Sequence, residues 1–426
     1  MSSASQPLPD LEPTATAAAS HPVEANYARK AVFASAIGYG LDGFDLLILS
    51  FALSGIIASF QLSDPQAAAL TTVTLLGAVT GGLIFGLLSD RFGRVRMLTI
   101  SVIVFGVFTG LSAIAVGYWD LAAYRFLAGA GIGGEFGIGM TLAAEAVPAR
   151  WRARATGWVA IGFQVGVLAA ALISAPVITA FGWRALFVVG AVPALVALIF
   201  RSRLHESPKF LESRDTAAVA AAQGTRPRSR VRLLFGDART TRITIALTVL
   251  ASVQNFGYFG IMTWLPRYLE TQFGLNLAST SVWTAVTVIG MMLGIFTFGV
   301  LADKIGRRVT FWIIQMGAIV SLLVYSQLND PIALLIGGFV MGFFANGMLG
   351  CLGALMAEQY PTDIRATAQN LIFNVGRGIA GFAPIVIALV AGVGGFPLAL
   401  SLLPAIYILA FFTMFAIPER RGEELD

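Results

Sequence analysis

Two aspartates, Asp42 and Asp45, lie near the middle of an apolar stretch, residues 31–53, that is long enough to cross a lipid bilayer. A carboxylate at the bilayer centre costs about 2.5–3.5 kcal/mol on the insertion scale, so hydrophobic matching alone does not select two. Their spacing places both on one helix face, which must border a protein interior or a water-filled cavity. We expect the pair to exchange protons; the alternative is two neutral, hydrogen-bonded acids that only hold helices together.

Three further ionisable side chains lie inside other apolar stretches. Glu135 and Arg125 share one stretch, and Arg377 lies in another near the C-terminal end. We assign Asp42, Asp45, Glu135 and Arg125 to a proton-coupling cluster, because a cation that approaches a buried carboxyl group favours release of its proton. The planar guanidinium of Arg377 suits bidentate binding of a carboxylate; the alternative is a structural ion pair with an acid of another helix.

The elements that must position these residues are membrane-spanning helices. The chain has 426 residues, of which 57% are hydrophobic and only 12% are charged, whereas soluble domains are about 25% charged. The single cysteine, Cys351, excludes an intrachain disulfide, and the two histidines, His21 and His205, lie outside the apolar stretches. We therefore expect no metal site and no cofactor. The residue patterns of nucleotide-binding loops and of nucleophile–histidine pairs are missing, so an enzyme is not expected.

Twelve apolar stretches predict an all-α membrane protein with twelve transmembrane helices. They cover residues 30–57, 67–88, 97–117, 121–147, 155–179, 184–200, 242–265, 279–301, 309–328, 331–357, 366–391 and 396–417. The long polar connector at residues 201–241 divides them into two sets of six. We predict a disordered tail at 1–28, six-helix bundles at 29–200 and 242–417, a linker at 201–241, and a short tail at 418–426.

The basic residues predict the orientation of these helices. With the N-terminus inside, 24 of the 28 Lys and Arg residues lie on the cytoplasmic side, and the outer loops hold only Arg184 and Arg267. The positive-inside rule therefore places both termini in the cytoplasm. The net charge of +5 reflects this topology, and nucleic-acid binding is not expected.

The depth of each polar residue in the membrane can be estimated by counting residues from the cytoplasmic end of its stretch, at about 1.5 Å per residue. Most of the polar residues then lie within about 10 Å of one depth, near the middle of the bilayer. Arg125 lies nearer the outer side. The remaining candidates for substrate binding at that level are Asn374, Gln164, Gln254, Asn255, Asn346, Tyr39, Phe44, Tyr258 and Phe373. A lone amide in a membrane helix is as often a contact between helices as a ligand, and aromatic residues also serve packing.

The two halves repeat. The segment GLLSDRFGRV at 86–95 matches GVLADKIGRR at 299–308, which aligns Asp90 with Asp303. The same offset in residue number aligns Glu145, Pro148 and Arg152 with Glu358, Pro361 and Arg365. A constant offset across two motifs indicates a duplicated six-helix unit, which is typical of one transporter architecture.

The doubled loop G-x-L-x-D-[RK]-x-G-R resembles the signature of the major facilitator superfamily. The first half carries Val95 where the family pattern usually has a basic residue. The resemblance implies two pseudo-symmetric six-helix bundles, a cytoplasmic gate formed by this loop, and proton transfer by the arginine of R-x-x-x-G, here Arg125 and Gly129. The gating candidates are Asp90, Arg91, Arg94, Glu145, Arg152, Asp303, Arg307, Arg308, Glu358 and Arg365. Some of these arginines could instead only fix the topology.

Shorter segments narrow the resemblance. LDGFD at 41–45 and GAGIGGEFG at 129–137 resemble the first and fourth helices of aromatic acid:proton symporters and sialic acid porters. YPTDIRATAQNLIFNVGRG at 360–378 resembles the eleventh-helix region of metabolite:proton symporters, and HESPKFLESR at 205–214 is similar to a motif of several solute-carrier families. No single subfamily accounts for all four.

We therefore expect a monomeric proton-coupled symporter of the bacterial inner membrane that imports a small organic anion. The resemblance and the aromatic residues favour an aromatic monocarboxylate, of the benzoate type or nicotinate. Sialic acid or an aliphatic monocarboxylate is the alternative substrate. A proton-linked drug exporter is less favoured, because the fifth stretch lacks the Gly-Pro pair usual in exporters of this superfamily. A receptor that binds without transport is disfavoured, since such proteins tend to add large cytoplasmic domains.

Overall fold

The computed structural model describes residues 22–147, 152–201 and 230–420, and all regular elements in these ranges are helices. The first helices are α1 (Pro22–Phe60), α2 (Asp64–Phe92), α3 (Arg94–Ser112), α4 (Tyr118–Glu145), α5 (Arg152–Phe181) and α6 (Trp183–Arg201). The later ones are α8 (Arg230–Leu233), α9 (Ala238–Phe273), α10 (Leu277–Ile305), α11 (Arg307–Tyr325), α12 (Pro331–Ala345), α13 (Leu349–Gln359), α14 (Thr362–Ala380), α15 (Ala383–Thr413) and the 3-10 turn η2 (Met414–Ala416).

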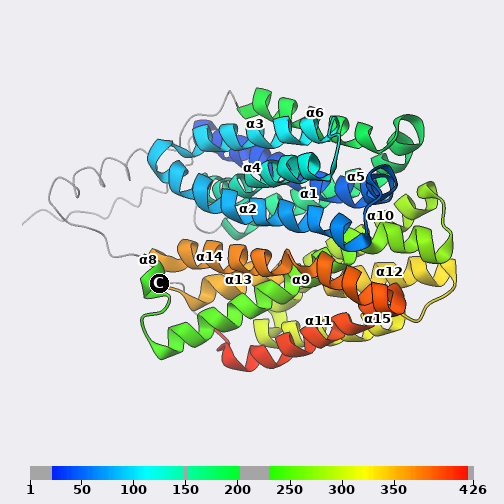
Figure 1. The fold of residues 1–426 in the computed structure, drawn as a ribbon. Coiled ribbons are helices and arrows are strands. Elements are labelled where there is room, and N and C mark those ends of the chain that lie inside the picture. Colours follow the sequence, from blue (N-terminus) through cyan, green and yellow to red (C-terminus); the bar gives the residue numbers. More distant parts are fainter. Residues whose placement is uncertain (1–21, 148–151, 202–229, 421–426) are drawn as a thin grey trace, which may run out of the picture.

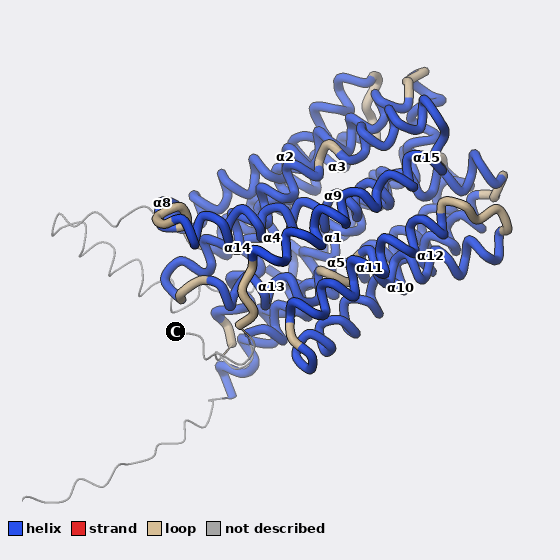
Figure 2. The backbone as a smooth tube through the Cα atoms, turned by 90° about the horizontal axis from the view of Figure 1, so that it is seen from below, coloured by secondary structure: helices blue, strands red, loops and turns tan. Residues whose placement is uncertain are grey.

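The helices form two groups that follow each other in the sequence. Figure 1 shows α1–α6 together on one side and α9–α15 on the other. In the first group α1 packs against α5, α2 against α4 and α3 against α6; in the second, α9 packs against α14, α10 against α12 and α11 against α15. Figure 2 shows that the long axes of the helices in both groups are roughly aligned with one another. The arrangement matches the two predicted bundles, although their limits at 29–200 and 242–417 remain predictions.

The helices begin earlier than the predicted limits of the two bundles. The first helix begins at Pro22, inside the predicted tail 1–28, and a proline suits the first helical position because its missing N–H would be unpaired there anyway. The last part of the predicted linker contains α8 and the start of α9. Asp237 caps α9 by accepting a hydrogen bond from the backbone of Thr240. Residues 202–229 lie outside the described part.

The backbone repeats the duplication seen in the sequence. Gly93, between α2 and α3, and Gly306, between α10 and α11, both adopt φ of 103°, a conformation that favours glycine. A Cβ on Gly129 of α4 would collide with the carbonyl of Thr74 on α2, and a Cβ on Gly342 of α12 would collide with that of Thr287 on α10. Each glycine of the first half is related to its counterpart by the offset of the repeated motifs, so the halves share close glycine-mediated helix packing.

The described residues contain nine helical stretches that are long and apolar enough to cross a membrane. This count treats α12–α13 as one stretch and Thr367–Ala416 as another. The latter has 50 residues and non-helical backbone at Gly394 and Gly395, and about 20 residues suffice for one crossing. The chain is a multi-pass membrane protein; twelve crossings and two cytoplasmic termini remain predictions.

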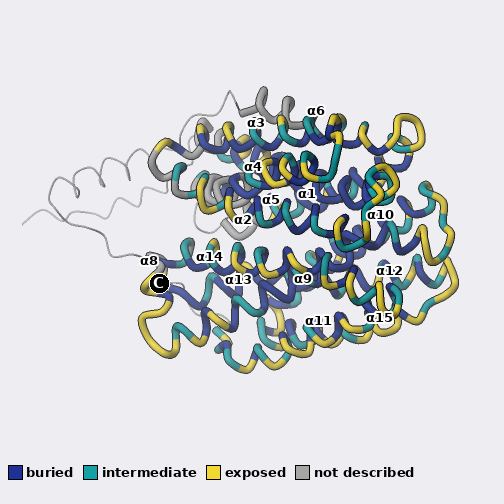
Figure 3. Tube along the Cα trace, in the orientation of Figure 1, coloured by how far each residue is buried: buried dark blue, intermediate teal, exposed yellow. Residues whose placement is uncertain are grey.

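The distribution of side chains fits a membrane environment. Large apolar side chains such as Phe296 and Leu389 are more than half exposed on the periphery. In contrast, Asp45, Arg125 and Arg377 are buried. Figure 3 shows the buried segments gathered where helices face one another. The polar interior is therefore the place where a site must be sought.

Candidate functional site

Asp45 of α1 and Arg125 of α4 form a fully buried ion pair. Arg125 Nη1 donates to Asp45 Oδ1 at 3.0 Å, and Nη2 donates to Oδ2. Thr109 Oγ1 of α3 also donates to Asp45 Oδ1 at 3.0 Å, and Arg125 Nε donates to Thr74 Oγ1 of α2 at 3.4 Å. Four helices of the first bundle thus satisfy the two charges together. The count of residues along each helix places Arg125 nearer the outer side than Asp45, whereas the two side chains are in contact.

The two threonines in this network were not anticipated from the sequence. Hydroxyl groups in apolar helices commonly bond to the backbone of their own helix, as Thr74 does to the carbonyl of Leu70 at 2.7 Å. Only the packing of α2 and α3 against α4 shows that Thr74 and Thr109 also reach Arg125 and Asp45.

Asp42 lies one turn before Asp45 and is also fully buried. Tyr39 lies one turn before Asp42 on α1, and its phenol interacts electrostatically with both Asp42 and Arg377. Tyr39 packs on Phe163 of α5 with ring centroids 4.7 Å apart, and Phe163 lies 6.0 Å from Tyr258 of α9. These three aromatic side chains, Tyr39, Phe163 and Tyr258, bridge the two bundles and are called here the aromatic bridge.

Arg377 of α14 belongs to the second bundle and lies near the aromatic bridge. Only 2% of the residue is exposed, yet its Nε and Nη1 atoms have no hydrogen-bond partner among the described residues. Both Tyr39 and Tyr258 lie within range of its charge. The neighbouring Gly376 brings α14 close to Ala251 and Ser252 of α9. In the described part of the chain Arg377 makes no ion pair, so the structural role considered as its alternative has no acid to support it there.

Three predicted amides present buried polar atoms. Gln254 Nε2 donates to Asn346 Oδ1 at 2.5 Å, which leaves Gln254 Oε1 and Asn346 Nδ2 without partners in the described segments. Asn346 lies in the break between α12 and α13. Both amide atoms of Gln164 on α5 are buried and likewise lack a described partner. The offset of the repeats aligns Gln164 with Arg377, so the two occupy equivalent positions.

The remaining predicted binding residues make other described contacts. Asn255 Nδ2 donates to the carbonyl of Ala251 in its own helix at 2.8 Å. Asn374 Nδ2 donates to the carbonyl of Asn370 at 2.9 Å, and its side chain lies beside Gly82 of α2. Phe44 lies near Gly190 of α6, inside the first bundle. Phe373 is buried. The roles of all four in substrate binding stay predictions.

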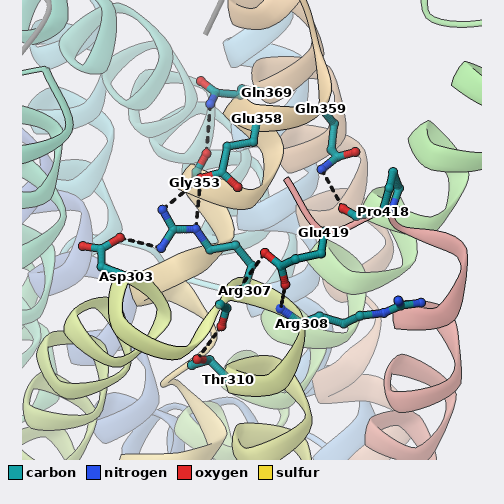
Figure 4. Close-up of polar contacts among 11 residues, drawn as sticks. Asp303, Arg307, Arg308, Thr310, Gly353, Glu358, Gln359, Gln369, Pro418 and Glu419 are labelled. Atoms are coloured by element: carbon teal, nitrogen blue, oxygen red, sulfur yellow. Dashed lines mark hydrogen bonds and ion pairs between the residues drawn. The ribbon is translucent and has the colours of Figure 1, made fainter. Parts of the chain in front are cut away.

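One set of polar contacts joins four of the five predicted gating residues of the second half: Asp303, Arg307, Arg308 and Glu358 (Figure 4). Arg307 donates to Asp303 at 2.5 Å and to Glu358 Oε1 from Nε and Nη2 at 3.0 and 2.9 Å. Arg308 Nη2 donates to the carbonyl of Phe415 at 3.1 Å, and Arg365 Nε donates to that of Ala357 at 2.9 Å. The loop between α10 and α11 is thus tied to α13 and to the end of the second bundle.

A further acid joins this network that the sequence did not single out. Glu419 accepts from the backbone N–H groups of Arg307 and Arg308 at 3.1 and 2.7 Å. It thereby satisfies two unpaired donors at the start of α11, where a negative charge is favourable. Some predicted residues have side chains outside the described set. They are the gating candidates of the first half, Asp90, Arg91, Arg94, Glu145 and Arg152, and Glu135 of the predicted proton-coupling cluster.

Two contacts join the bundles at the opposite end of the molecule. Arg267 of α9 pairs with Asp64 of α2 at 2.8 Å. Ser54 Oγ of α1 donates to Glu270 Oε2 of α9 at 2.7 Å. These contacts, called here the outer tie, were not predicted, because the residues are common at the ends of helices and only their meeting across the bundles distinguishes them.

Two helical bundles with ionisable groups buried at and near their boundary define a membrane transporter. The chain belongs to the Major Facilitator Superfamily, whose family model matches residues 35–296 and 268–425. The recognition from the doubled loop is thus confirmed. The members with similar sequences are transporters, so the expectation that this protein is not an enzyme is confirmed as well.

Three relatives illustrate the similarity. A Haemophilus influenzae protein named "Putative metabolite transport protein" is 53% identical over 94% of this chain and 98% of its own. The "Cis,cis-muconate transport protein" of Acinetobacter baylyi is 33% identical over 87% of this chain and 89% of its own. The "Sialic acid transporter NanX" of Escherichia coli is 29% identical over 92% and 94%.

A solved structure supports the fold. The crystal structure of a D-xylose-proton symporter superposes with a TM-score of 0.76, over 94% of this chain and 100% of that one. The sequence identity is 20%, so this likeness concerns the fold alone.

Proposed function

We propose that this protein is a proton-coupled symporter that imports a small organic anion by alternating access between its two bundles. The observation that carries the proposal is Arg377, a buried guanidinium near the aromatic bridge with two donor atoms that have no partner in the described structure. A buried cation is costly unless it is paired. A substrate carboxylate supplies the missing charge and hydrogen bonds.

The aromatic bridge favours an aromatic acid as the substrate. Tyr39 and Tyr258 lie within electrostatic range of Arg377 and are less than 10% exposed. A flat ring can stack on such side chains while its carboxylate pairs with the guanidinium. We propose a benzoate-type acid or nicotinate; sialic acid and aliphatic monocarboxylates are the alternatives within the same mechanism.

The names of relatives fit an organic acid. They refer to cis,cis-muconate, niacin and sialic acid, and each of these compounds carries a carboxyl group. Muconate carries two, and Asn346 Nδ2, which has no partner in the described segments, provides a donor for a second carboxylate. An acid with a second carboxyl group is therefore a further candidate.

We propose that Asp42, Asp45, Glu135 and Arg125 couple transport to protons. In the structure Arg125 donates to both carboxylate oxygens of Asp45. Protonation of Asp45 would weaken this pairing. Arg125 and its four-helix network would then rearrange, and this gives the first bundle two states. Import of an anion against an inside-negative potential costs about 2.3 kcal/mol per charge at 100 mV, and a co-transported proton offsets that cost. We propose that the protein works as a monomer in the inner membrane.

A matched acid and amide test the role of Arg377. Binding of nicotinate and nicotinamide to the purified protein is measured by calorimetry for wild type, Arg377→Lys and Arg377→Ala. Both variants should lose affinity for the acid and far less for the amide, because lysine keeps the charge but not the two-pronged geometry. Benzoate and benzamide provide a second pair if nicotinate does not bind.

The alternatives give different outcomes in the same experiment. A structural role for Arg377 predicts that lysine largely restores binding and that acid and amide suffer alike. A well-folded Arg377→Ala protein with wild-type affinity for the acid would refute the carboxylate site. A drug exporter would bind lipophilic cations in preference to either acid, and sialic acid or lactate in place of the aromatic acids would change only the substrate assignment.

A further inference from the structure

A groove of about 530 Å³ opens on the periphery of the second bundle, between α9, α14 and α15. It lies away from the substrate site: Val375 and Ile379 line it from α14, whereas Arg377 on the same helix is buried. Ile245 and Val249 line it from α9, and Leu409 lines it from α15. More than half of Ile245 and Leu409 is exposed, so the groove faces the surroundings of the bundle.

The interior of the groove is apolar although hydroxyl groups line it. Thr248 Oγ1 donates to the carbonyl of Thr244, and Ser252 Oγ donates to that of Thr248, each at 2.7 Å. Thr244 Oγ1 donates to the carbonyl of Leu234 and lies 2.8 Å from the hydroxyl of Tyr360. The hydroxyls are therefore satisfied by the protein, and the groove offers a ligand only apolar contacts.

The groove has the length of one membrane leaflet. Its lining residues on α9 extend from Thr244 to Phe256, which at about 1.5 Å per residue corresponds to about 18 Å. Half of the hydrocarbon core of a bilayer is about 15 Å. The dimensions thus suit an acyl chain that enters from one surface of the membrane.

Three arginines lie close in the sequence to the residues at one end of the groove. Arg239 and Arg242 precede Ile245 on α9 at successive intervals of three residues, which places all three on one helix face. Arg232 lies on α8, just before Phe235, which also lines the groove. All three arginines are exposed. Figure 1 shows α8 beside the end of α14, at the end of the molecule that the distribution of Lys and Arg predicts to be cytoplasmic.

We propose that this groove binds one anionic phospholipid of the cytoplasmic leaflet, with an acyl chain along α9 and the headgroup phosphate against Arg232, Arg239 and Arg242. Basic sites between helices on that side suit anionic headgroups. A second copy of the chain is a poorer occupant, because a two-fold axis along the membrane normal brings the same arginines of both copies together. The site backs onto α9 and α14, which carry Tyr258 and Arg377, so the lipid stabilises the second bundle.

Native mass spectrometry of the full chain tests the site with phosphatidylglycerol and phosphatidylcholine of identical acyl chains. We expect one tightly retained phosphatidylglycerol and about tenfold weaker retention of phosphatidylcholine, since two or more arginines contact the anionic headgroup. The double variant Arg239→Gln/Arg242→Gln should lose the preference. Lys304→Gln removes an exposed cation from the last turn of α10 and should keep it.

A second pair of variants tests the groove itself. Val249→Trp should displace both lipids by filling the groove, whereas Leu293→Trp, at an exposed position of α10 outside the groove, should have no effect. Equal retention of the two lipids, or retention that ignores the arginine variants, would show only unspecific annular lipid and overturn the proposal. Conversion of a dimer into a monomer by Val249→Trp, measured by light scattering, would identify an interface between copies instead.

Discussion

Arg125 on α4 holds Asp45 on α1 through both carboxylate oxygens, and neither side chain is exposed at all. Asp42, one turn earlier on the same face of α1, lies instead near Tyr39. The phenol of Tyr39 also interacts electrostatically with Arg377. The two aspartates that the sequence could not distinguish therefore face different surroundings. Each of them leads to a separate prediction.

Asp45→Asn should abolish pH-driven uptake and also destabilise the protein, because it leaves the Arg125 cation buried without its carboxylate. Breaking a buried pair from one side costs about 3–5 kcal/mol. The double variant Asp45→Asn/Arg125→Gln should recover much of the thermal stability without recovering coupling. Thermal unfolding and proton-driven uptake in proteoliposomes measure the two effects; full concentrative uptake by Asp45→Asn would contradict the coupling role.

Asp42→Asn should also abolish pH-driven uptake, but its thermal unfolding should stay closer to wild type, since the Asp45–Arg125 pair is intact. Exchange of substrate across the membrane without a pH gradient separates binding from coupling and should be partly preserved. An Asp42→Asn protein that is folded and still concentrates substrate in response to pH would remove Asp42 from the proton site.

The outer tie should favour the conformation in which the bundles meet at that end. Charge reversal by Arg267→Asp or Asp64→Arg alone should open it, and the double swap Arg267→Asp/Asp64→Arg should restore it. A partly exposed pair of this kind contributes up to about 1 kcal/mol, or about fivefold in the conformational equilibrium. Labelling of Gln164→Cys by a membrane-impermeant thiol reagent, in a Cys351→Ser background, reports the change.

The matching control for the outer tie is Arg184→Gln. Arg184 is the other basic residue predicted for the outer loops, and Nη2 donates to the carbonyl of Ala115 within the first bundle. It should leave the labelling rate unchanged. If all charge variants accelerate labelling equally, general loosening of the helix ends explains the effect better than a contact between bundles.

Gly342→Ala should destabilise the second bundle, because the added Cβ would collide with the carbonyl of Thr287 on α10. Overpacking of this kind costs about 1–3 kcal/mol. Gly353→Ala on α13 is the control, since a Cβ there has nothing within 4 Å. A drop in the thermal unfolding temperature for Gly342→Ala alone supports the packing; equal stability of both variants would mean that α10 and α12 separate easily.

The sequence by itself determined the properties that depend on composition and on spacing along the chain. Apolar stretches of about 20 residues predict membrane-spanning helices because of the bilayer thickness. The constant offset between the repeated motifs predicts the duplicated unit, which Gly93 and Gly306 repeat in their backbone conformation. The cost of a buried charge singled out Asp42, Asp45, Arg125 and Arg377 without knowledge of any neighbour.

Only the tertiary structure decided which of these side chains meet. The pairing of Arg125 with Asp45 depends on the rotation of α1 and α4 about their axes, which α2 and α3 fix through Thr74 and Thr109. Residues at one depth can face different neighbours: Phe44 lies toward α6 and Asn374 toward α2. Hydrophobicity places a helix in the membrane but barely constrains its rotation, because lipid and protein interiors are similarly apolar; close glycine contacts and polar pairs between helices set it.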